Sequence, residues 1–441
     1  MKFIIQSLFV FLFFVPLIST AQKKVSLFYD TIPNQVKEEF YLIEEGGKQV
    51  KHGVFKSYYT NGQLETLGKF KSGKRDSTFA SFYRNGDKQA VVDYKSDLKN
   101  GKFIIYDTSG AVMQEGEYVN DTLNGTMTVY YPNQEIAKKS QFKNGRLNGK
   151  VEVYYETGVL KEEGEYLNNK ANGLTKKYYP IGKLESEEEF LNGTPNGIYK
   201  TYYENGQVNI IARNVNGKKE GEFLQYASNG KLVLKTLYQN DQVVDYFLAY
   251  YIDGTPKQET YFKKGVREGL EKFYHENGKI QKTIKYSSQE LNQEILEYYD
   301  NGAKKAEVFI EMKRPTGTWK FYHENGKLKT EEPYIEGKIE GKRKTYRQDG
   351  TLEMEEDYKK GQKYGYVTLY DENEKMTEQI PYRSNMKAGT YKTYHPNGKI
   401  AILGIYRYGK KNDAWRYYDE SGKMIKTIQY NADNVVSETK N

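Results

Sequence analysis

Polar and apolar positions recur along the chain with a period of 24 residues from Gly53 onward. If Gly53 is numbered position 0, the same position holds glycine in twelve of sixteen copies. The exceptions are Ser77, Asp245, Gln293 and Asp413. A fixed period of about 20–50 residues is the signature of a repeat architecture. We therefore expect sixteen tandem units over residues 53–436, without insertion or deletion.

Each unit has the pattern of a β-hairpin. Position 5 is aromatic in every unit, position 11 is mostly aliphatic, and position 9 is glycine in fourteen units, as in Tyr-Glu-Asn-Gly at 203–206. Asn-Gly between runs rich in Tyr, Val, Ile and Phe predicts a hairpin, and a three-residue loop pairs position 5 with position 11. We interpret the position-5 column as structural aromatics, including Tyr58, Tyr106, Tyr154, Tyr202, Tyr250, Tyr298, Tyr346 and Tyr394.

A second turn is expected at positions 19–20, where Gly, Asp and Asn predominate. It brings the aromatic column at position 17, interrupted only at Asn214 and Ile310, toward the large residues at position 2 of the next unit. Positions 2 and 5 have opposite parity, which strict alternation places on opposite faces. Either both faces carry an aromatic stripe, or the first strand is bulged or bent; we favour a coiled sheet with one richer face. The predicted fold class is all-β, an elongated antiparallel ribbon of tandem 24-residue hairpins.

The segments outside the repeats have other expected roles. Residues 1–21 combine Lys2, an apolar stretch and a small-residue exit at Ser19-Thr20-Ala21, which predicts a signal peptide cleaved after Ala21; an uncleaved membrane anchor is the alternative. We expect an exported chain, in the periplasm, on the cell surface or secreted, without membrane insertion after cleavage. Residues 22–52 are interpreted as an N-terminal cap segment and residues 437–441 as a polar tail.

Composition narrows the classes of function. Hydrophobic residues make up 37% of the chain and aromatics 15%, with 43 Tyr, which fits a thin sheet whose rings keep their hydroxyls wet. The net charge of +8 comes from interleaved acids and bases, so we expect no nucleic-acid partner. Cysteine is absent, which excludes disulfides, thiol nucleophiles and zinc–thiolate sites.

The columns resemble a known family. Units such as GIYKTYYENGQVNI (197–210) and GTYKTYHPNGKI (389–400) look like the variant MORN repeat, the form found in bacterial YwqK-like antitoxins. The resemblance covers 53–436 and implies antiparallel hairpin ribbons used as scaffolds. The unit here usually has one opening glycine rather than a Gly-x-Gly pair.

Candidate chemistry is sparse. His275, His323 and His395 share position 6, too far apart for one metal ion, and no phosphate-binding glycine loop of the GxxxxGK[ST] type occurs. We predict no enzyme activity, no catalytic residues, no cofactor and no metal. The best candidate binding surface is the position-6 run of Tyr131, Tyr155, Tyr179 and Tyr203, which alternatively only covers the second face of the sheet.

The leading hypothesis for function is an exported, non-catalytic interaction or scaffold protein that binds other proteins along its length. A carbohydrate- or cell-wall-binding module is the first alternative, although only Trp319 and Trp415 are available for ring stacking of that kind. The YwqK-like antitoxin is the second, and the predicted signal peptide argues against it.

Overall fold

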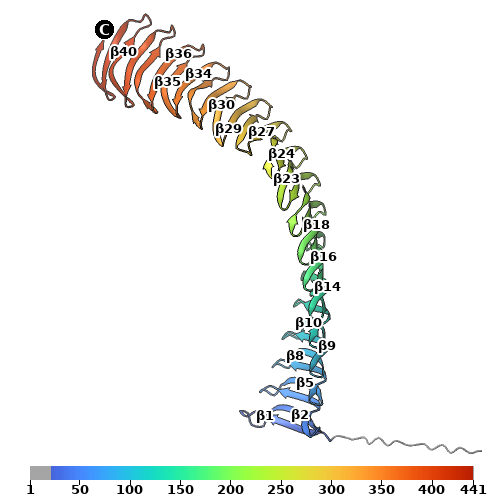
Figure 1. Cartoon of the computed structure of the whole chain (residues 1–441). Helices are drawn as coiled ribbons and strands as arrows, with labels where there is room; N and C mark the ends of the chain where they lie inside the picture. Colours follow the sequence, from blue (N-terminus) through green and yellow to red (C-terminus); the bar gives the residue numbers. More distant parts are fainter. Residues whose placement is uncertain (1–20, 441) are drawn as a thin grey trace, which may run out of the picture. The chain divides into compact units, whose positions relative to one another are not determined.

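The computed structural model describes residues 21–440. The predicted signal peptide therefore lies outside the described residues, apart from Ala21. All regular elements in the described range are strands (Figure 1). Residues 21–440 contain no helix long and apolar enough to cross a membrane. The chain divides into two compact units, one ending at Gly206 and one beginning at Gln207.

The first unit is an antiparallel sheet in which strands pair with their neighbours in the sequence. Its strands are β1 (Lys23–Phe28), β2 (Val36–Glu45), β3 (Lys48–Lys51), β4 (Gly53–Tyr58), β5 (Leu64–Lys71), β6 (Lys74–Arg75), β7 (Ser77–Phe82), β8 (Lys88–Lys95), β9 (Leu98–Tyr106), β10 (Val112–Val119), β11 (Thr122–Leu123), β12 (Gly125–Tyr130), β13 (Ile136–Lys143), β14 (Arg146–Tyr154), β15 (Leu160–Leu167), β16 (Lys170–Tyr178), β17 (Leu184–Leu191) and β18 (Thr194–Tyr202). The expected cap segment, 22–52, forms β1 to β3 and extends the sheet with two further hairpins.

The second unit continues the same repeat. Its strands are β19 (Val208–Val215), β20 (Lys218–Lys219), β21 (Gly221–Tyr226), β22 (Leu232–Gln239), β23 (Gln242–Tyr250), β24 (Pro256–Lys263), β25 (Val266–Arg267), β26 (Gly269–Tyr274), β27 (Ile280–Ser287), β28 (Asn292–Tyr298), β29 (Lys304–Glu311), β30 (Arg314–Tyr322), β31 (Leu328–Ile335), β32 (Lys338–Ile339), β33 (Gly341–Tyr346), β34 (Leu352–Lys359), β35 (Gln362–Tyr370), β36 (Met376–Arg383), β37 (Met386–Lys387), β38 (Gly389–Tyr394), β39 (Ile400–Arg407), β40 (Lys410–Tyr418), β41 (Met424–Asn431) and β42 (Asn434–Lys440). The expected polar tail is strand at 437–440, because these residues pair with β41.

The hairpin register is the one expected from the sequence. Tyr154 at position 5 pairs with Leu160 at position 11, and the same pairing recurs along both units, as at Tyr394 and Ile400. A register shift precedes each of these pairs, because the second strand carries one extra residue at position 12. Such a bulge lets the strands close around the loop while the rest of the hairpin stays in register.

The opening glycine of each unit lies at a second irregularity. Between β13 and β14, Ser140 pairs with Val151 and Phe142 pairs with Leu147, so extra residues of β14 are accommodated around Gly149. Gly149 has φ of 115°, a conformation that residues with a Cβ rarely adopt. Gln293 occupies the equivalent position in β28. The register between β27 and β28 has no shift, and the turn that joins them, at 288–290, instead has three residues at positive φ.

Positions 2 and 5 lie on opposite faces of the sheet. The ring of Phe79, at position 2, contacts Phe70, at position 17 of the preceding repeat, with centroids 5.6 Å apart. The hydroxyl of Tyr130, at position 5, instead donates to the carboxylate of Glu115, at position 14. Positions 14 and 17 have opposite parity on the second strand and therefore opposite faces. Both faces thus carry an aromatic stripe, the first of the two alternatives, rather than one richer face produced by a bent first strand.

In some repeats a glycine at position 15 makes room for the ring at position 2 of the next repeat, as Gly68 does for Phe79 and Gly404 for Trp415. Trp415 is 2% exposed and packs against Tyr391, Tyr406 and Tyr430, with centroids 5.0, 5.3 and 5.8 Å away. A Cβ added at Gly404 would lie 2.3 Å from the indole of Trp415. Gly404 is outside the positive-φ residues, so its requirement is steric and not conformational.

We expect Gly404→Ala to destabilise β38 to β41 by about 1–3 kcal/mol, because the methyl group overpacks the indole. Amide hydrogen exchange in these strands measures the local free energy of opening. In a Trp415→Val background the same substitution should cost little, because a small residue at position 15 then faces Val at position 2. The chain already contains such a pair, Ser140 with Val151. An equal cost in both backgrounds would contradict the steric explanation.

Candidate interaction surface

The four tyrosines predicted as a binding surface lie in one column of the repeat, and the hydroxyls of three of them bond to the neighbouring repeat. Tyr131, Tyr155 and Tyr179 each donate to the main-chain carbonyl of the position-5 residue in the next repeat, at 2.8, 2.8 and 2.7 Å. Tyr203 occupies the same position and is half-buried like the others. The column joins one repeat to the next, and its rings offer partly exposed edges rather than a free hydroxyl ladder.

The three histidines of position 6 make the same inter-repeat contact as these tyrosines. Nε2 of His275, His323 and His395 lies 3.1, 3.0 and 2.9 Å from the carbonyl oxygen of the next repeat's position-5 tyrosine. Each histidine therefore substitutes for a tyrosine hydroxyl in an inter-repeat bond. Among residues 21–440, no group of three or more His, Asp or Glu could hold a metal ion.

The asparagine of the hairpin loop performs two tasks. Oδ1 of Asn277 accepts the main-chain N–H of Lys279 within its own loop, and its Nδ2 donates 2.8 Å to the carbonyl of Asp300 in the next loop. Asn397 repeats both contacts with Lys399 and Glu420. Asx turns of this kind explain the Asn-Gly preference, and the second bond fastens neighbouring loops together.

The face that carries position 5 is a ladder of phenols and carboxylates. Tyr178 and Tyr202 donate to Glu163 and Glu187 of the preceding repeat, both at 2.7 Å. Burial, and then the hydrogen bond to this carboxylate, raise the pKa of each phenol to about 12. For Tyr130 the hydrogen bond to Glu115 is the larger cause, and its pKa is also raised to about 12.

We expect these phenols to ionise well above the ordinary tyrosine pKa of about 10. Because the folded state holds their protons more tightly than the unfolded state, their contribution to stability is complete below about pH 10 and is lost as the pH rises through about 12. Ultraviolet titration of tyrosinate should show a late-ionising group, and Glu163→Gln should lower the pKa of Tyr178. Titration of all tyrosines together near pH 10 would refute the ladder.

The opposite face combines aromatic rings with cations. Wherever position 22 holds Lys or Arg, the cation lies over the position-17 ring of the next repeat, as with Arg75 over Tyr94 at 4.0 Å and Lys99 over Tyr118 at 5.0 Å. In the remaining repeats position 22 is apolar, as at Leu147. Each cation shields one ring face from water and gains about 0.5–1 kcal/mol of cation–π attraction.

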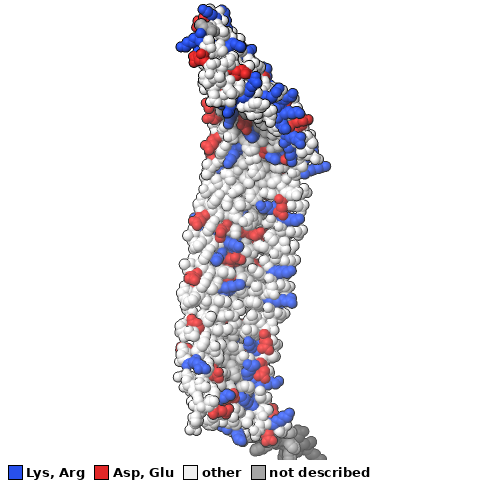
Figure 2. Space-filling view, turned by 90° about the vertical axis from the view of Figure 1, so that its left-hand side faces the viewer, with Lys and Arg blue, Asp and Glu red and all other residues white. Residues whose placement is uncertain are grey.

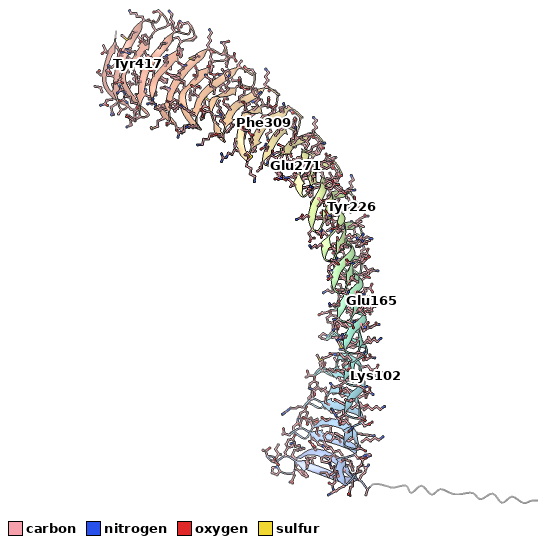
Figure 3. All side chains as sticks on the ribbon, viewed as in Figure 1. Lys102, Glu165, Tyr226, Glu271, Phe309 and Tyr417 are labelled. Atoms are coloured by element: carbon pink, nitrogen blue, oxygen red, sulfur yellow. The ribbon has the colours of Figure 1, made fainter. Side chains whose placement is uncertain are left out.

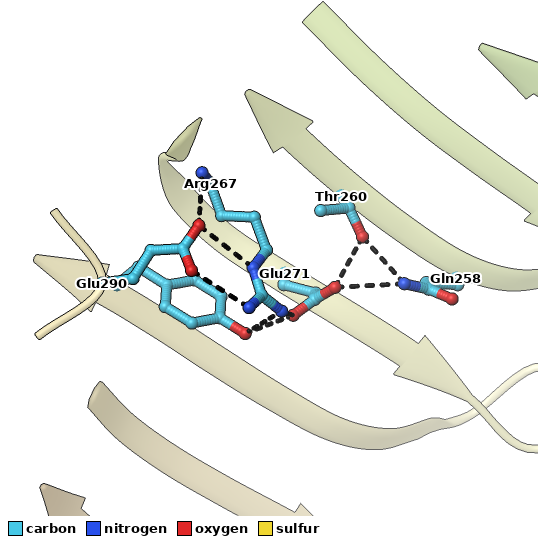
Figure 4. Close-up of polar contacts among 6 residues, drawn as sticks. Gln258, Thr260, Arg267, Glu271 and Glu290 are labelled. Atoms are coloured by element: carbon cyan, nitrogen blue, oxygen red, sulfur yellow. Dashed lines mark hydrogen bonds and ion pairs between the residues drawn. The ribbon is translucent and has the colours of Figure 1, made fainter. Parts of the chain in front are cut away.

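One repeat of the second unit replaces the position-2 aromatic with a buried carboxylate (Figures 3 and 4). Glu271 is 4% exposed and accepts hydrogen bonds from Thr260 at 2.7 Å, Tyr286 at 2.7 Å and Gln258 at 3.0 Å. Nη1 of Arg267 lies 3.6 Å from the same carboxylate.

Arg267 is itself held from the other side. Its Nε and Nη2 lie 3.2 and 3.1 Å from the carboxylate of Glu290, and its main-chain N–H donates 2.8 Å to Glu290. The hydrogen bond from Arg267 lowers the pKa of Glu290. Every charged group of the network thus has a partner. These contacts let the carboxylate of Glu271 be buried at a position that is aromatic in many other repeats.

We expect Arg267→Leu to destabilise β26 and β27 by about 3 kcal/mol, because Glu271 then stays buried without its cation. The double variant Arg267→Leu with Glu271→Ile should recover most of that loss, since the next repeat carries Leu291 and Ile295 at the same positions. Hydrogen exchange in β26 and β27 distinguishes the two. If the second substitution adds to the loss, the network is more than a substitute for apolar packing.

Exposed apolar side chains gather on the second turn, at positions 18, 19 and 21, which sequence reasoning did not single out. They are Leu98, Val119, Leu167, Leu191, Val215, Met312, Ile335, Met386 and Tyr408. Charged side chains of both signs are interleaved over the face shown in Figure 2. These residues could have been recognised in the sequence as apolar residues beside turn formers, at positions that are usually polar. We call these positions the outer-turn column.

Comparison with known families matches these repeats to one model, described as the MORN repeat variant. The matched residues are 51–72, 99–120, 123–144, 147–168, 171–192, 195–213, 219–240, 267–287, 315–336, 339–360, 387–408 and 414–432. The chain belongs to the MORN repeat variant family. No curated protein matches it.

Two solved structures give weak similarities. One is the Photorhabdus luminescens Tc holotoxin pore with the mutation TccC3-D651A, at 13% identity and a TM-score of 0.12 over 93% of this chain and 30% of that chain. The other is TcdB2-TccC3 without its hypervariable C-terminal region, at 12% identity and a TM-score of 0.13, with the same coverage. This chain spans about a third of the length of either.

The MORN repeat variant matches leave out four repeats that the structure nevertheless builds as hairpins. They begin at Ser77, Asp245, Gln293 and Gly365. Three of them lack the opening glycine, and the fourth has Glu374 in place of the loop glycine. Their strands β7–β8, β23–β24, β28–β29 and β35–β36 keep the position 5 to position 11 pairing. The hairpin register is therefore kept where either the opening glycine or the loop glycine is missing.

Proposed function

We propose that this protein is a non-catalytic interaction protein whose repeats bind other proteins along the outer-turn column. The observation that carries the proposal is the exposure of apolar side chains on turns in both units. Leu191 is 50% exposed and Ile335 is 60% exposed. Removing apolar groups from water lowers the free energy of the system. We therefore infer that exposed apolar residues that recur on these turns are contact sites.

The rest of the repeat supports this assignment of the contact surface. The hydroxyls of Tyr155 and Tyr179 and the amide of Asn277 are bonded to neighbouring repeats, so substituting them would weaken the ribbon. Side chains at positions 18 and 19 can differ between repeats without such a cost. A ribbon of this kind presents many variable contact points on a constant frame, which suits a scaffold.

We expect a photo-crosslinking residue at Leu191 of the full chain to form adducts with other proteins in its native cells, since this side chain is exposed on the outer turn. The matched control is the same crosslinking residue at Thr157, which is exposed on the hairpin loop of the preceding repeat. Adducts at Leu191 and few at Thr157 support the outer-turn column. If neither site forms adducts and the chain co-sediments with purified cell-wall glycan, the carbohydrate-binding alternative is favoured.

We also propose that the chain is exported, on the basis of residues 1–21. Fractionation of the same cells tests this proposal. We expect the chain outside the cytosol, with an N-terminus that begins at Gln22. Recovery from the cytosol in complex with a toxin would overturn export and favour the antitoxin alternative.

A further inference from the structure

A groove in the second unit lies between the outer turns of two successive repeats. It has a volume of about 400 Å³ and is lined by Arg383, Ser384, Met386, Ala388, Tyr406, Arg407 and Tyr408. The first turn joins β36 to β37 and the second joins β39 to β40. Among the lining residues, Met386 and Tyr408 project into solvent with 53% and 86% exposure.

Tyr408 is an unusual residue for its backbone position. Its φ is +49°, in the left-handed region that a bulky side chain rarely adopts. Some equivalent turns use asparagine, which tolerates this conformation, as at Asn120 and Asn240, whereas others hold residues such as Met312 and Glu336 at similar φ. A ring that is 86% exposed gains almost no burial in return. The backbone strain is shared by other residues of this column, so it is the exposed aromatic ring beside the groove that points to a role in binding.

The groove has a positive border. Arg383 and Arg407 stand at position 18 of the two turns, and none of the residues that line the groove is acidic. Beside it, Nζ of Lys387 lies over the Tyr406 ring at 5.2 Å. Within residues 21–440, the carboxylate that forms an ion pair with these cations is that of Asp413, 2.8 Å from Nη2 of Arg407. An incoming carboxylate can therefore pair with Arg383 and share Arg407.

The equivalent groove three repeats earlier has the opposite border. It has a volume of about 330 Å³ and also contains exposed apolar side chains, those of Met312 and Ile335. Glu311 and Glu336 flank them, with Arg314 as the lining cation. Two turns with similar apolar content thus differ in the sign of their charge, and charge sign is what selects between partner segments of similar apolar content.

We propose that the groove between Met386 and Tyr408 binds a linear segment of a partner protein in which an apolar or aromatic anchor is flanked by Asp or Glu. The anchor packs between the Met386 thioether and the Tyr408 ring, and the flanking carboxylates pair with Arg383 and Arg407. Charge complementarity to the arginine border selects this occupant. The inference rests on the proposed function and names the partner chemistry of one of its contact sites.

The test is fluorescence anisotropy with the full chain and a short fluorescein-labelled peptide that has Leu-Phe at its centre and Glu on both sides. We expect saturable binding that weakens with salt, and about tenfold weaker binding for Tyr408→Asn, because a central aromatic residue commonly carries a large share of the binding free energy. Asparagine suits the turn, so this variant keeps its fold. Arg383→Gln should weaken binding and flatten the salt dependence.

The matched control is Met312→Asn, which makes the same kind of change in the acidic groove and should leave the affinity unchanged. A counterpart peptide with Lys in place of Glu should bind at least tenfold more weakly. Equal binding of the two peptides, or full affinity in Tyr408→Asn, overturns the proposal. Absence of binding by either peptide also overturns it, whereas adducts at Leu191 would still support the general interaction function.

Discussion

The structure depends on hydrogen bonds that leave one repeat and end on the main chain of the next. A single sheet of 24-residue hairpins has two open faces and cannot enclose a thick core, so its rings are mostly half-buried. At the hairpin loops, Tyr155 and His275 reach the carbonyls of Tyr178 and Tyr298 in the following repeat. Without such contacts each hairpin would be marginal in water, because a two-stranded sheet buries too little apolar surface.

Sequence reasoning could predict the hairpin because its determinants are local. The Asn-Gly loop fixes the pairing of Tyr154 with Leu160 through turn geometry alone, and the period of 24 gives the phase. It could not decide between the two facial arrangements of positions 2 and 5. That answer depends on where the extra residues at position 12 and around Gly149 are accommodated, and bulges leave no distinct signal in a single sequence.

The position-6 tyrosines show a different limit. Their spacing indicated a ladder of rings, and the ladder exists, but a sequence does not show where a hydroxyl is directed. The hydroxyls of Tyr131 and Tyr179 meet carbonyls of the position-5 residue in the following repeat, a contact that follows only from the register of the sheet. The Glu271 network is similar: its partners Thr260 and Tyr286 are adjacent only because three successive strands bring positions 15, 2 and 17 together.

The two edges of the ribbon use different positions for the bonds between repeats, and the positions that are not used are free to vary. At the hairpin loops the inter-repeat bonds come from side chains, such as those of Tyr179 and Asn277, so these positions are constrained. At the outer turns the main chain provides one bond, as where the N–H of Gly409 donates 2.9 Å to the carbonyl of Lys387. Side chains at position 20 add a second in several repeats, as where Oδ1 of Asn385 accepts the N–H of Lys363 at 2.8 Å, but the side chain at position 19 is not the one that is used. A main-chain bond is indifferent to the neighbouring side chain.

The side chains at position 19 are consequently released from a structural task. This position is Ser or Asn throughout the first unit, but in the second it also holds Lys, Met, Glu, Tyr and Ala, all at positive φ. The backbone strain is similar for each non-Asn residue, so strain alone cannot account for the choice of Met312 in one turn and Tyr408 in another. What distinguishes these turns is the chemistry they present to solvent, and a repeat protein acquires distinct contact sites by varying the positions on which its own assembly does not depend.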